Sequence, residues 1–315
     1  GNFEPVVVPK YQSRGLSIER LVISLYAKGM SVSDIESEMQ EIYGINLSTS
    51  AISIITNKVS QAASEWQNRP LESLYMIVWM DGIVFKVREN GKVINKTVYL
   101  CVGLNKEGFK EVLGMWVGKN ESAAFWMGVL TDLKARGVED ILITVTDNLN
   151  GFTETIKSVF PASTTQICVV HQIRNSCRYV VWKERKEFTS DLKNIYNAPT
   201  KEAAEMELDN FEQKWGAKYP YAIRSWRNNW EELTVFFDFP VEIRKIIYTT
   251  NLIENLNGKI RKYTKNKLSF PNDDALKKSV YLAIAEIEKK WYQPIWNWAL
   301  IFNQFITIFE NRIQV

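Results

Sequence analysis

The sequence is poor in the residues that build disulfide frameworks and zinc sites. Its 315 residues include one histidine, His171, and three cysteines, Cys101, Cys168 and Cys177. An odd number of widely spaced cysteines does not make a disulfide framework, so we expect free thiols and a reduced, cytoplasmic environment. A structural zinc site usually needs four ligands, and these four residues are scattered along the chain. A small disulfide-stabilised protein is therefore excluded, and a zinc site has little support.

Long hydrophobic runs and a strong excess of charge are also missing. The most apolar stretch, residues 295–309, is interrupted by Asn297, Asn303 and Gln304, whereas about 18 apolar residues are needed to span a bilayer. No signal peptide is recognisable. The formal net charge is only +3, so a surface for nucleic acid has to come from local clusters of lysine and arginine. We expect a globular protein with no membrane partner.

The first 70 residues have the pattern of a small helical domain. Apolar residues recur at helical spacing over residues 18–28, and two further helices are expected over residues 34–43 and 51–66. The candidate caps are Ser31 or Ser33 for the second helix and Ser48 or Ser50 for the third. Two helices joined by a short glycine-containing turn resemble a helix-turn-helix unit that binds DNA, although a packing or linker domain has the same pattern.

From residue 71 the pattern changes to strands mixed with helices. Three apolar segments separated by polar turns predict an antiparallel meander over residues 74–87, 97–104 and 111–117. A helix, a fourth strand that leads to Asp147, a second helix and a fifth strand over residues 165–170 follow. This order is that of a ribonuclease-H-like α/β core with a mixed sheet, in which the first and fourth strands lie side by side.

The rest of the chain has a mostly helical composition. Residues 172–240 are rich in lysine, glutamate and tryptophan, and we interpret them as an α-helical insertion. The predicted domains are therefore a helical domain over residues 1–70, a first part of the core over 71–171, the insertion over 172–240, and a second part of the core over 241–315.

Three carboxylates occupy positions that suit a metal better than a core. Asp81 follows the apolar residues 74–80, Asp147 follows residues 141–146, and Glu254 lies in a segment predicted to be helical. If the first and fourth strands are neighbours, Asp81 and Asp147 lie side by side. Three converging carboxylates can hold two divalent cations and promote phosphoryl transfer on nucleic acid, although any one of them alone could be a surface or capping residue.

Four motifs together resemble the Mutator-type transposases of bacterial insertion sequences. They are Asp81-Gly82, Thr146-Asp147-Asn148, the run 166–175 that contains Cys168, His171, Arg174 and Asn175, and the run 251–257 that contains Glu254. The Cys-x-x-His-x-x-Arg-Asn pattern is the most specific, and the resemblance covers nearly the whole chain.

The resemblance implies a DDE transposase that cuts and joins double-stranded DNA at its element's terminal inverted repeats and at a target, in the bacterial cytoplasm at the nucleoid. Members of the family usually carry a further N-terminal segment. Since this chain begins Gly-Asn-Phe, we expect that segment to be missing.

The expected chemistry uses two metal ions held by Asp81, Asp147 and Glu254. One ion would activate the attacking oxygen and the other would stabilise the leaving 3′-oxygen. Ligation by oxygen atoms favours Mg²⁺, with Mn²⁺ as a substitute. The role of Cys168 and His171 stays open among a zinc site, a buried structural pair, and a histidine close to the DNA or the metals.

Two basic stretches are the candidates for DNA contact. Residues 258–278 carry seven basic side chains against two acidic ones, and the basic set includes Lys259, Arg261, Lys262, Lys265 and Lys267. The second stretch lies within residues 174–186. There Arg178 could contact phosphates, and Trp182 could stack on an unpaired base. The alternatives are a solvated lysine-rich helix face for the first stretch and a core position for Trp182.

Two other functions are compatible with the same residues. A ribonuclease-H-like nuclease or resolvase would use these acids without strand transfer, and a domesticated transposase would bind DNA without catalysis. The C-terminal helix has apolar residues on more than one face, between Ile295 and Phe309. A single stripe would serve the core of the protein, so the remainder predicts a homodimer, unless the helix lies sandwiched inside the subunit.

Overall fold

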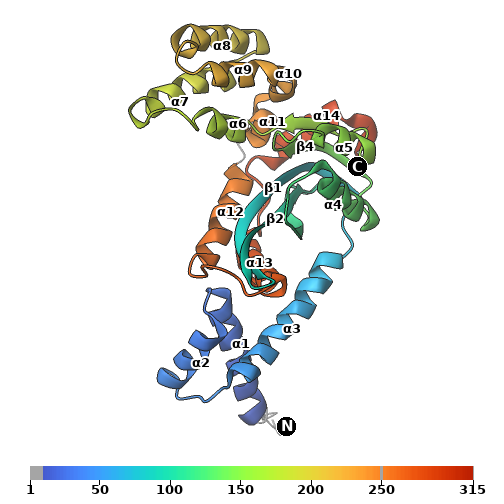
Figure 1. The fold of residues 1–315 in the computed structure, drawn as a ribbon. Helices are drawn as coiled ribbons and strands as arrows, with labels where there is room; N and C mark the ends of the chain where they lie inside the picture. The colour runs from blue at the N-terminus through green and yellow to red at the C-terminus, as the bar shows by residue number, and fades with distance from the viewer. Residues whose placement is uncertain (1–9, 249–250, 315) are drawn as a thin grey trace. The chain divides into compact units, whose positions relative to one another are not determined.

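The computed structural model describes residues 10–248 and 251–314, which form two compact units (Figure 1). The first unit contains the chain up to Arg69 together with residues 83–98 and 256–290. The second contains residues 70–82, 99–255 and 291–315. Among the described helices, none has the length and apolar character that a membrane span requires.

Three helices begin the first unit, as predicted: α1 (Lys10–Ala27), α2 (Val32–Glu41) and α3 (Thr49–Asn68). Ser31 caps α2, because its hydroxyl accepts from the Asp34 amide while the Asp34 carboxylate accepts from Ser31. The Ser48 hydroxyl caps α3 by accepting from the Ala51 amide. Each cap is worth about 1 kcal/mol of stability. The three helices share a buried core of Val22, Ile35, Met39 and Ile52.

The first unit also holds the turn between the two longest strands, most of one later helix and all of a second. Strand β1 (Leu74–Glu89) reaches β2 (Lys92–Leu104) through Asn90 and Gly91, which both have positive φ as a two-residue hairpin turn requires. Helix α12 (Asn251–Thr264) precedes α13 (Asp273–Glu288), which Asn272 caps. The buried Lys96 ammonium bonds the Asp273 carboxylate at 2.7 Å and 2.8 Å.

The sheet has five strands in the order β3-β2-β1-β4-β5, where β3 is Lys110–Gly118, β4 is Asp140–Thr146 and β5 is Thr164–Ile167. Strands β1 and β4 pair in parallel, from Leu74 opposite Asp140 to Trp79 opposite Val145. Strands β4 and β5 also pair in parallel. The prediction that the first and fourth strands are neighbours is confirmed.

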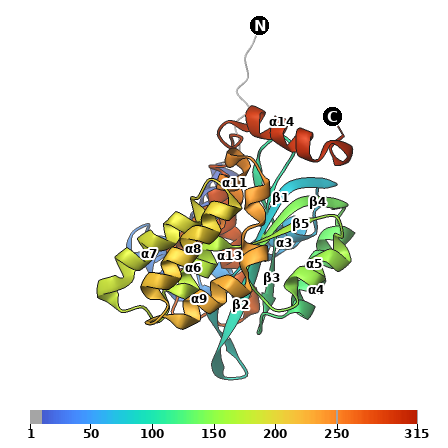
Figure 2. The same ribbon diagram turned by 90° about the horizontal axis from the view of Figure 1, so that it is seen from above.

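Burial on both faces explains why β1 begins with an unbroken apolar run. Residues 75–80 are all at most 2% exposed, as expected for a central strand covered on both sides. Helices α4 (Ala123–Ala135) and α5 (Phe152–Val159) lie together against one side (Figure 2). Trp126 and Phe152 stack there with ring centroids 4.7 Å apart. The hydrophobic cluster to which these two rings belong is the main core of the second unit.

The segment predicted as a helical insertion is helical. It contains α6 (Val169–Ser176), α7 (Trp182–Tyr196), α8 (Lys201–Trp215), α9 (Pro220–Asn228) and α10 (Trp230–Leu233), with the 3₁₀ turn η1 (Val235–Asp238) and α11 (Val241–Tyr248) after them. Phe188 of α7 packs edge-on against Phe211 and Trp215 of α8. The insertion therefore has an aromatic core of its own.

One strand is shorter than predicted. The strand expected over residues 165–170 ends at Ile167, and α6 begins at Val169. Cys168 is the reason, because its sulfur accepts from the His171 amide at 3.4 Å and so caps the helix. A sulfur cap leaves no mark in the apolar pattern, since residues 167–169 are all hydrophobic or cysteine and all buried.

The last helix, α14 (Trp298–Ile308), starts three residues later than the apolar run suggests, and the 3₁₀ turn η2 (Glu310–Arg312) follows it. The Trp298 ring lies against Gly108, where a Cβ atom would come within 2.4 Å of the indole. Ile301 and Phe305 are buried, whereas Leu300 and Ile308 are exposed. One face of α14 thus packs within the second unit and another faces outward.

Candidate active site

The pairing of β1 with β4 positions the two aspartates. The last paired residues are Trp79 and Val145, and Asp81 and Asp147 come two residues after them along parallel strands. Each carboxylate accepts a hydrogen bond from the next backbone amide: Gly82 donates to Asp81 Oδ1 at 2.8 Å, and Asn148 donates to Asp147 Oδ1 at 3.0 Å. The local backbone therefore fixes one oxygen of each aspartate.

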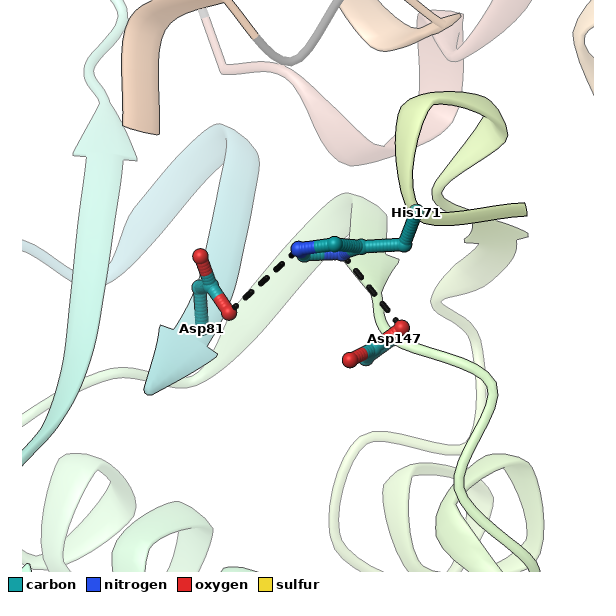
Figure 3. A group of neighbouring side chains, drawn as sticks. All are labelled: Asp81, Asp147 and His171. Atoms are coloured by element: carbon teal, nitrogen blue, oxygen red, sulfur yellow. Dashed lines mark ion pairs between the residues drawn. The ribbon is translucent and has the colours of Figure 1, made fainter. Parts of the chain in front are cut away.

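His171 lies between the two aspartates (Figure 3). Its Nε2 is 3.8 Å from Asp81 Oδ1 and its Nδ1 is 3.3 Å from Asp147 Oδ1. The cap made by Cys168 starts α6 at the end of β5, which places His171 in the first turn of the helix, beside Asp81 in the middle of β1 and Asp147 just past the end of β4. One ligand atom from each of the three residues lies within 4.8 Å of the others.

Cys168 and the two aspartates together change the acidity of His171. Burial lowers the pKa of the imidazole, but a hydrogen bond and charge from Cys168, together with the charges of Asp147 and Asp81, outweigh burial and raise the pKa to about 9. The imidazole therefore carries a proton at neutral pH when nothing else balances the aspartates. Its Nδ1 is buried and has no hydrogen-bond partner among the described residues.

Glu254 is not part of this group of ligand atoms. It lies in the first turn of α12, and its Oε1 accepts a hydrogen bond from Arg174 Nη2. Arg174 stands one turn after His171 on α6, and its side chain is 63% exposed. The predicted adjacency of Asp81 and Asp147 is therefore present, while the convergence of Glu254 with them stays a prediction.

The structure gives the aspartates two further neighbours. His171, for which a place close to the metals was one of the alternatives left open by the sequence, contacts both acids directly. Glu121 went unrecognised in the sequence: it lies just before α4, and the Trp126 indole donates to its Oε1 at 3.2 Å. Desolvation of its carboxyl group and the charges of Asp147 and Asp81 raise the pKa of Glu121, against the hydrogen bond from Trp126. Nothing in the sequence around Glu121 signals this position.

The cysteines take no part in the group. Cys101, Cys168 and Cys177 are all buried, and none of them forms a disulfide. Burial raises the pKa of Cys101 and of Cys177, which keeps them protonated and poor as ligands. Among the described residues, the group able to hold a cation contains no cysteine. The geometry thus brings a histidine, and no cysteine, to the two aspartates among the described residues.

The predicted DNA contacts fall into different environments. Trp182 begins α7 and is 83% exposed, which excludes the core position. The Arg185 guanidinium lies 5.9 Å from its ring centroid, and Arg178 and Asn175 are exposed nearby in sequence. On the other stretch Arg261, Lys262 and Lys265 are exposed, and Lys259 is half-buried.

Lys267 differs from the other lysines of its stretch. Its ammonium lies 4.0 Å from the Tyr26 ring centroid and donates to Ser279 Oγ at 3.1 Å. Burial and the charge of Lys278 lower its pKa from 10.5 to about 8. Packing within the first unit therefore accounts for Lys267 without DNA, and its predicted role in binding stays a prediction.

Comparison with known proteins gives a consistent set of relatives. The family model described as "Transposase, Mutator family" matches residues 1–294. A probable transposase for an ISRM3-like insertion sequence element from Sinorhizobium fredii is 43% identical over 99% of this chain and 78% of its own length. The transposase for ISRM3 from Rhizobium meliloti is equally similar. A probable insertion-sequence transposase from Corynebacterium diphtheriae is 40% identical over 92% of this chain and 85% of its own length.

Proposed function

Because this chain belongs to the Mutator family of transposases, we propose that it binds the terminal inverted repeats of an insertion sequence and catalyses metal-dependent DNA cleavage and strand transfer. The observation that carries the proposal is the pair Asp81 and Asp147, set side by side by the register of β1 and β4 with His171 between them. The strand order β3-β2-β1-β4-β5 supports a ribonuclease-H-like core.

The donor set fits divalent cations. Asp81 and Asp147 offer carboxylate oxygens, which Mg²⁺ and Mn²⁺ prefer, and the buried Nδ1 of His171 offers a nitrogen. We propose that Asp81, Asp147 and Glu254 hold two such ions, with His171 beside them. When bound, the ions supply activation of the attacking oxygen and stabilisation of the leaving 3′-oxygen.

The residues of the chain orient the site and balance its charge. The amides of Gly82 and Asn148 hold the two carboxylates in place before any ligand arrives. Protonated His171 offsets their mutual repulsion in the metal-free protein, because opposite charges within about 4–6 Å favour the charged forms. Loss of this proton leaves a neutral imidazole, which is the form able to donate an electron pair to a metal.

Arg174 connects Glu254 to this group through α6. The pair is exposed on the arginine side, so a DNA phosphate can compete with Glu254 for the Arg174 guanidinium. We propose that this exchange releases Glu254 to act as the third carboxylate. Arg174 then positions the DNA strand instead of the glutamate.

DNA contact is proposed for both basic stretches. Arg178 and the exposed Trp182 ring present a charge and a stacking surface on the insertion, which suits a phosphate next to an unpaired base. Lys259, Arg261 and Lys262 present charge along α12, Lys265 directly follows the helix, and Lys267 belongs to the same stretch. The same proposal gives the helices α1–α3 a role in DNA binding and makes the active form a homodimer on paired ends.

An assay with two DNA substrates tests the function. The protein is incubated with Mg²⁺, an oligonucleotide that carries the inverted repeat, and a supercoiled target plasmid. Joined products are expected. Cleavage without joining would instead identify a nuclease or resolvase, and a mobility shift without either reaction would identify a DNA-binding protein.

A further inference from the structure

A cavity of about 420 Å³ in the first unit collects an unusual number of positive charges. Five lysines line it, together with one carboxylate, that of Glu286: Lys28, Lys259, Lys262, Lys265 and Lys290. Lys28 directly follows α1, Lys265 directly follows α12, and Lys290 lies just beyond α13. Segments far apart in the sequence thus bring ammonium groups to one hollow.

The positive charges of this lysine cavity are not neutralised by the protein. Glu286 Oε1 is bound to Lys289 Nζ at 2.5 Å, and Lys289 does not line the cavity. None of the five lysines forms an ion pair with a carboxylate in the part of the chain that the structure describes. The cavity therefore keeps an excess of positive charge in the folded protein.

Helix capping is the simplest alternative role for these lysines. Each helix C-terminus carries a partial charge of about −0.5, so three of them supply about −1.5. Five ammonium groups exceed this by a wide margin, and Lys259 lies more than a turn before the end of α12. Favourable interaction with the helix ends can explain one or two of the lysines but leaves a net attraction for an anion.

The position of Lys28 is fixed by the packing of its neighbour. Gly29 has φ +98°, and a Cβ atom there would lie 2.8 Å from the backbone oxygen of Tyr263. The end of α1 and the end of α12 therefore meet in backbone contact, as only glycine permits. This contact holds Lys28 beside Lys259 and Lys262 on the rim of the cavity, which preorganises the site before a ligand binds.

We propose that the lysine cavity binds the backbone of duplex DNA through two or more adjacent phosphates, and that Lys28 and Lys290 are part of this site. The inference rests on the proposed function and deepens it. Lysine ammonium groups act as point charges for phosphate without reading bases, so the site contributes affinity and register, and no sequence preference. Lys259 and Lys262 lie on α12 and Lys265 directly follows it, so DNA held here would contact the helix whose first turn contains Glu254.

The test compares two double variants of the full chain that lose the same charge. Lys28→Ala with Lys290→Ala removes two ammonium groups from the cavity rim, and Lys86→Ala with Lys92→Ala removes two exposed lysines of the first unit that lie outside the cavity and outside α1–α3. Binding to a 30-base-pair duplex of unrelated sequence is measured from low to moderate salt. The cavity variant is expected to bind at least about tenfold more weakly, with a salt slope smaller by roughly 2, while the control stays near wild type.

Several outcomes would overturn the proposal. One is a wild-type slope in the cavity variant, and another is an equal loss in the control. A third is tight binding of inorganic tripolyphosphate by the wild type that depends on Lys28 and Lys290 while duplex binding does not, because the ligand would then be a free polyphosphate. The conservative pair Lys28→Gln and Lys290→Gln, with thermal unfolding, guards against a folding defect.

Strand joining, measured on the same proteins, separates the two proposals. If the wild type joins ends and the cavity variant keeps its salt slope, the cavity assignment fails and the function stands. If the slope falls but the wild type joins nothing, the cavity assignment stands and the function fails.

Discussion

At the scale of single residues, the ion pair between Arg174 and Glu254 is compatible with two roles for the glutamate. Glu254 is either a metal ligand that DNA releases from Arg174 or a permanent partner of Arg174, and the two roles lead to different predictions. The arginine is 63% exposed, so the pair adds at most about 1 kcal/mol to stability. Its presence in the fold is therefore not explained by stability.

Glu254→Gln should abolish cleavage and joining, because an amide cannot replace a carboxylate ligand. Arg174→Ala should keep measurable activity and lower the affinity for DNA, since it removes a phosphate contact but no metal ligand. Both variants should unfold within about 1 kcal/mol of the wild type. Equal losses of activity in the two variants would mean that Glu254 acts only as the partner of Arg174.

Lys267 makes the stability of the protein depend on pH. Its pKa is about 8 in the folded protein and 10.5 ordinarily, so below pH 8 the buried ammonium costs stability. As the pH rises from 8 to 10.5, the folded state loses the proton first, and stability increases. The Tyr26 ring, which favours the charged form, keeps this gain below about 3 kcal/mol.

Lys267→Met should remove this gain while the methionine side chain continues to cover Tyr26. Urea unfolding at pH 7.5 and pH 10 gives the free energy of unfolding of the variant and of the wild type. The difference between the two proteins is compared at the two pH values, because the titration of tyrosines contributes equally to both proteins and drops out of the difference. The wild type should gain stability relative to the variant as pH rises. An unchanged difference would show that Lys267 titrates normally.

At the scale of helices and strands, the sequence predicted what depends on local pattern. The buried run of residues 75–80 and the serine caps at Ser31 and Ser48 identified β1, α2 and α3 because each signal lies within a few residues. The early end of β5 was not predicted, since it depends on a sulfur cap. The location of His171 between two strands follows from that cap, and so the full candidate site was out of reach.

Helix α12 carries a prediction of its own. Replacing Lys259, Lys262 and Lys265 together with Ala should weaken binding to all DNA sequences about equally and reduce the salt slope by roughly 3, as expected for lost phosphate contacts. Titrations against inverted-repeat and unrelated duplexes check this. A slope equal to that of the wild type would show that this face of α12 does not meet DNA.

At the scale of the whole molecule, the outward face of α14 bears on assembly. Ile301 and Phe305 are buried, but Trp296 is 89% exposed, and Leu300 and Ile308 are exposed beside it in the sequence. If α14 were sandwiched inside the subunit, which was the alternative left open by the sequence, these apolar side chains would not be exposed. Under the proposed function, two transposon ends would be joined to one target in a coordinated way, which a single active site per complex would not provide.

The active form is therefore expected to be a dimer on paired ends. Light scattering with and without end DNA measures its mass, and Trp296→Ser with Leu300→Ser should reduce the dimeric fraction while leaving the fold intact, because both side chains are exposed. A strictly monomeric protein in complexes that still complete strand transfer would defeat this expectation.

The central claim is that Asp81 and Asp147 catalyse DNA strand transfer with divalent metal. The most direct measurement is joining of an inverted-repeat end to a plasmid by the wild type, Asp81→Asn, Asp147→Asn and the exposed control Asp238→Asn, each with Mg²⁺, with Mn²⁺ and with chelator. The wild type and the control should join ends only with metal, and both site variants should bind DNA yet join nothing. Metal-dependent joining by either site variant at a rate near that of the wild type would contradict the account.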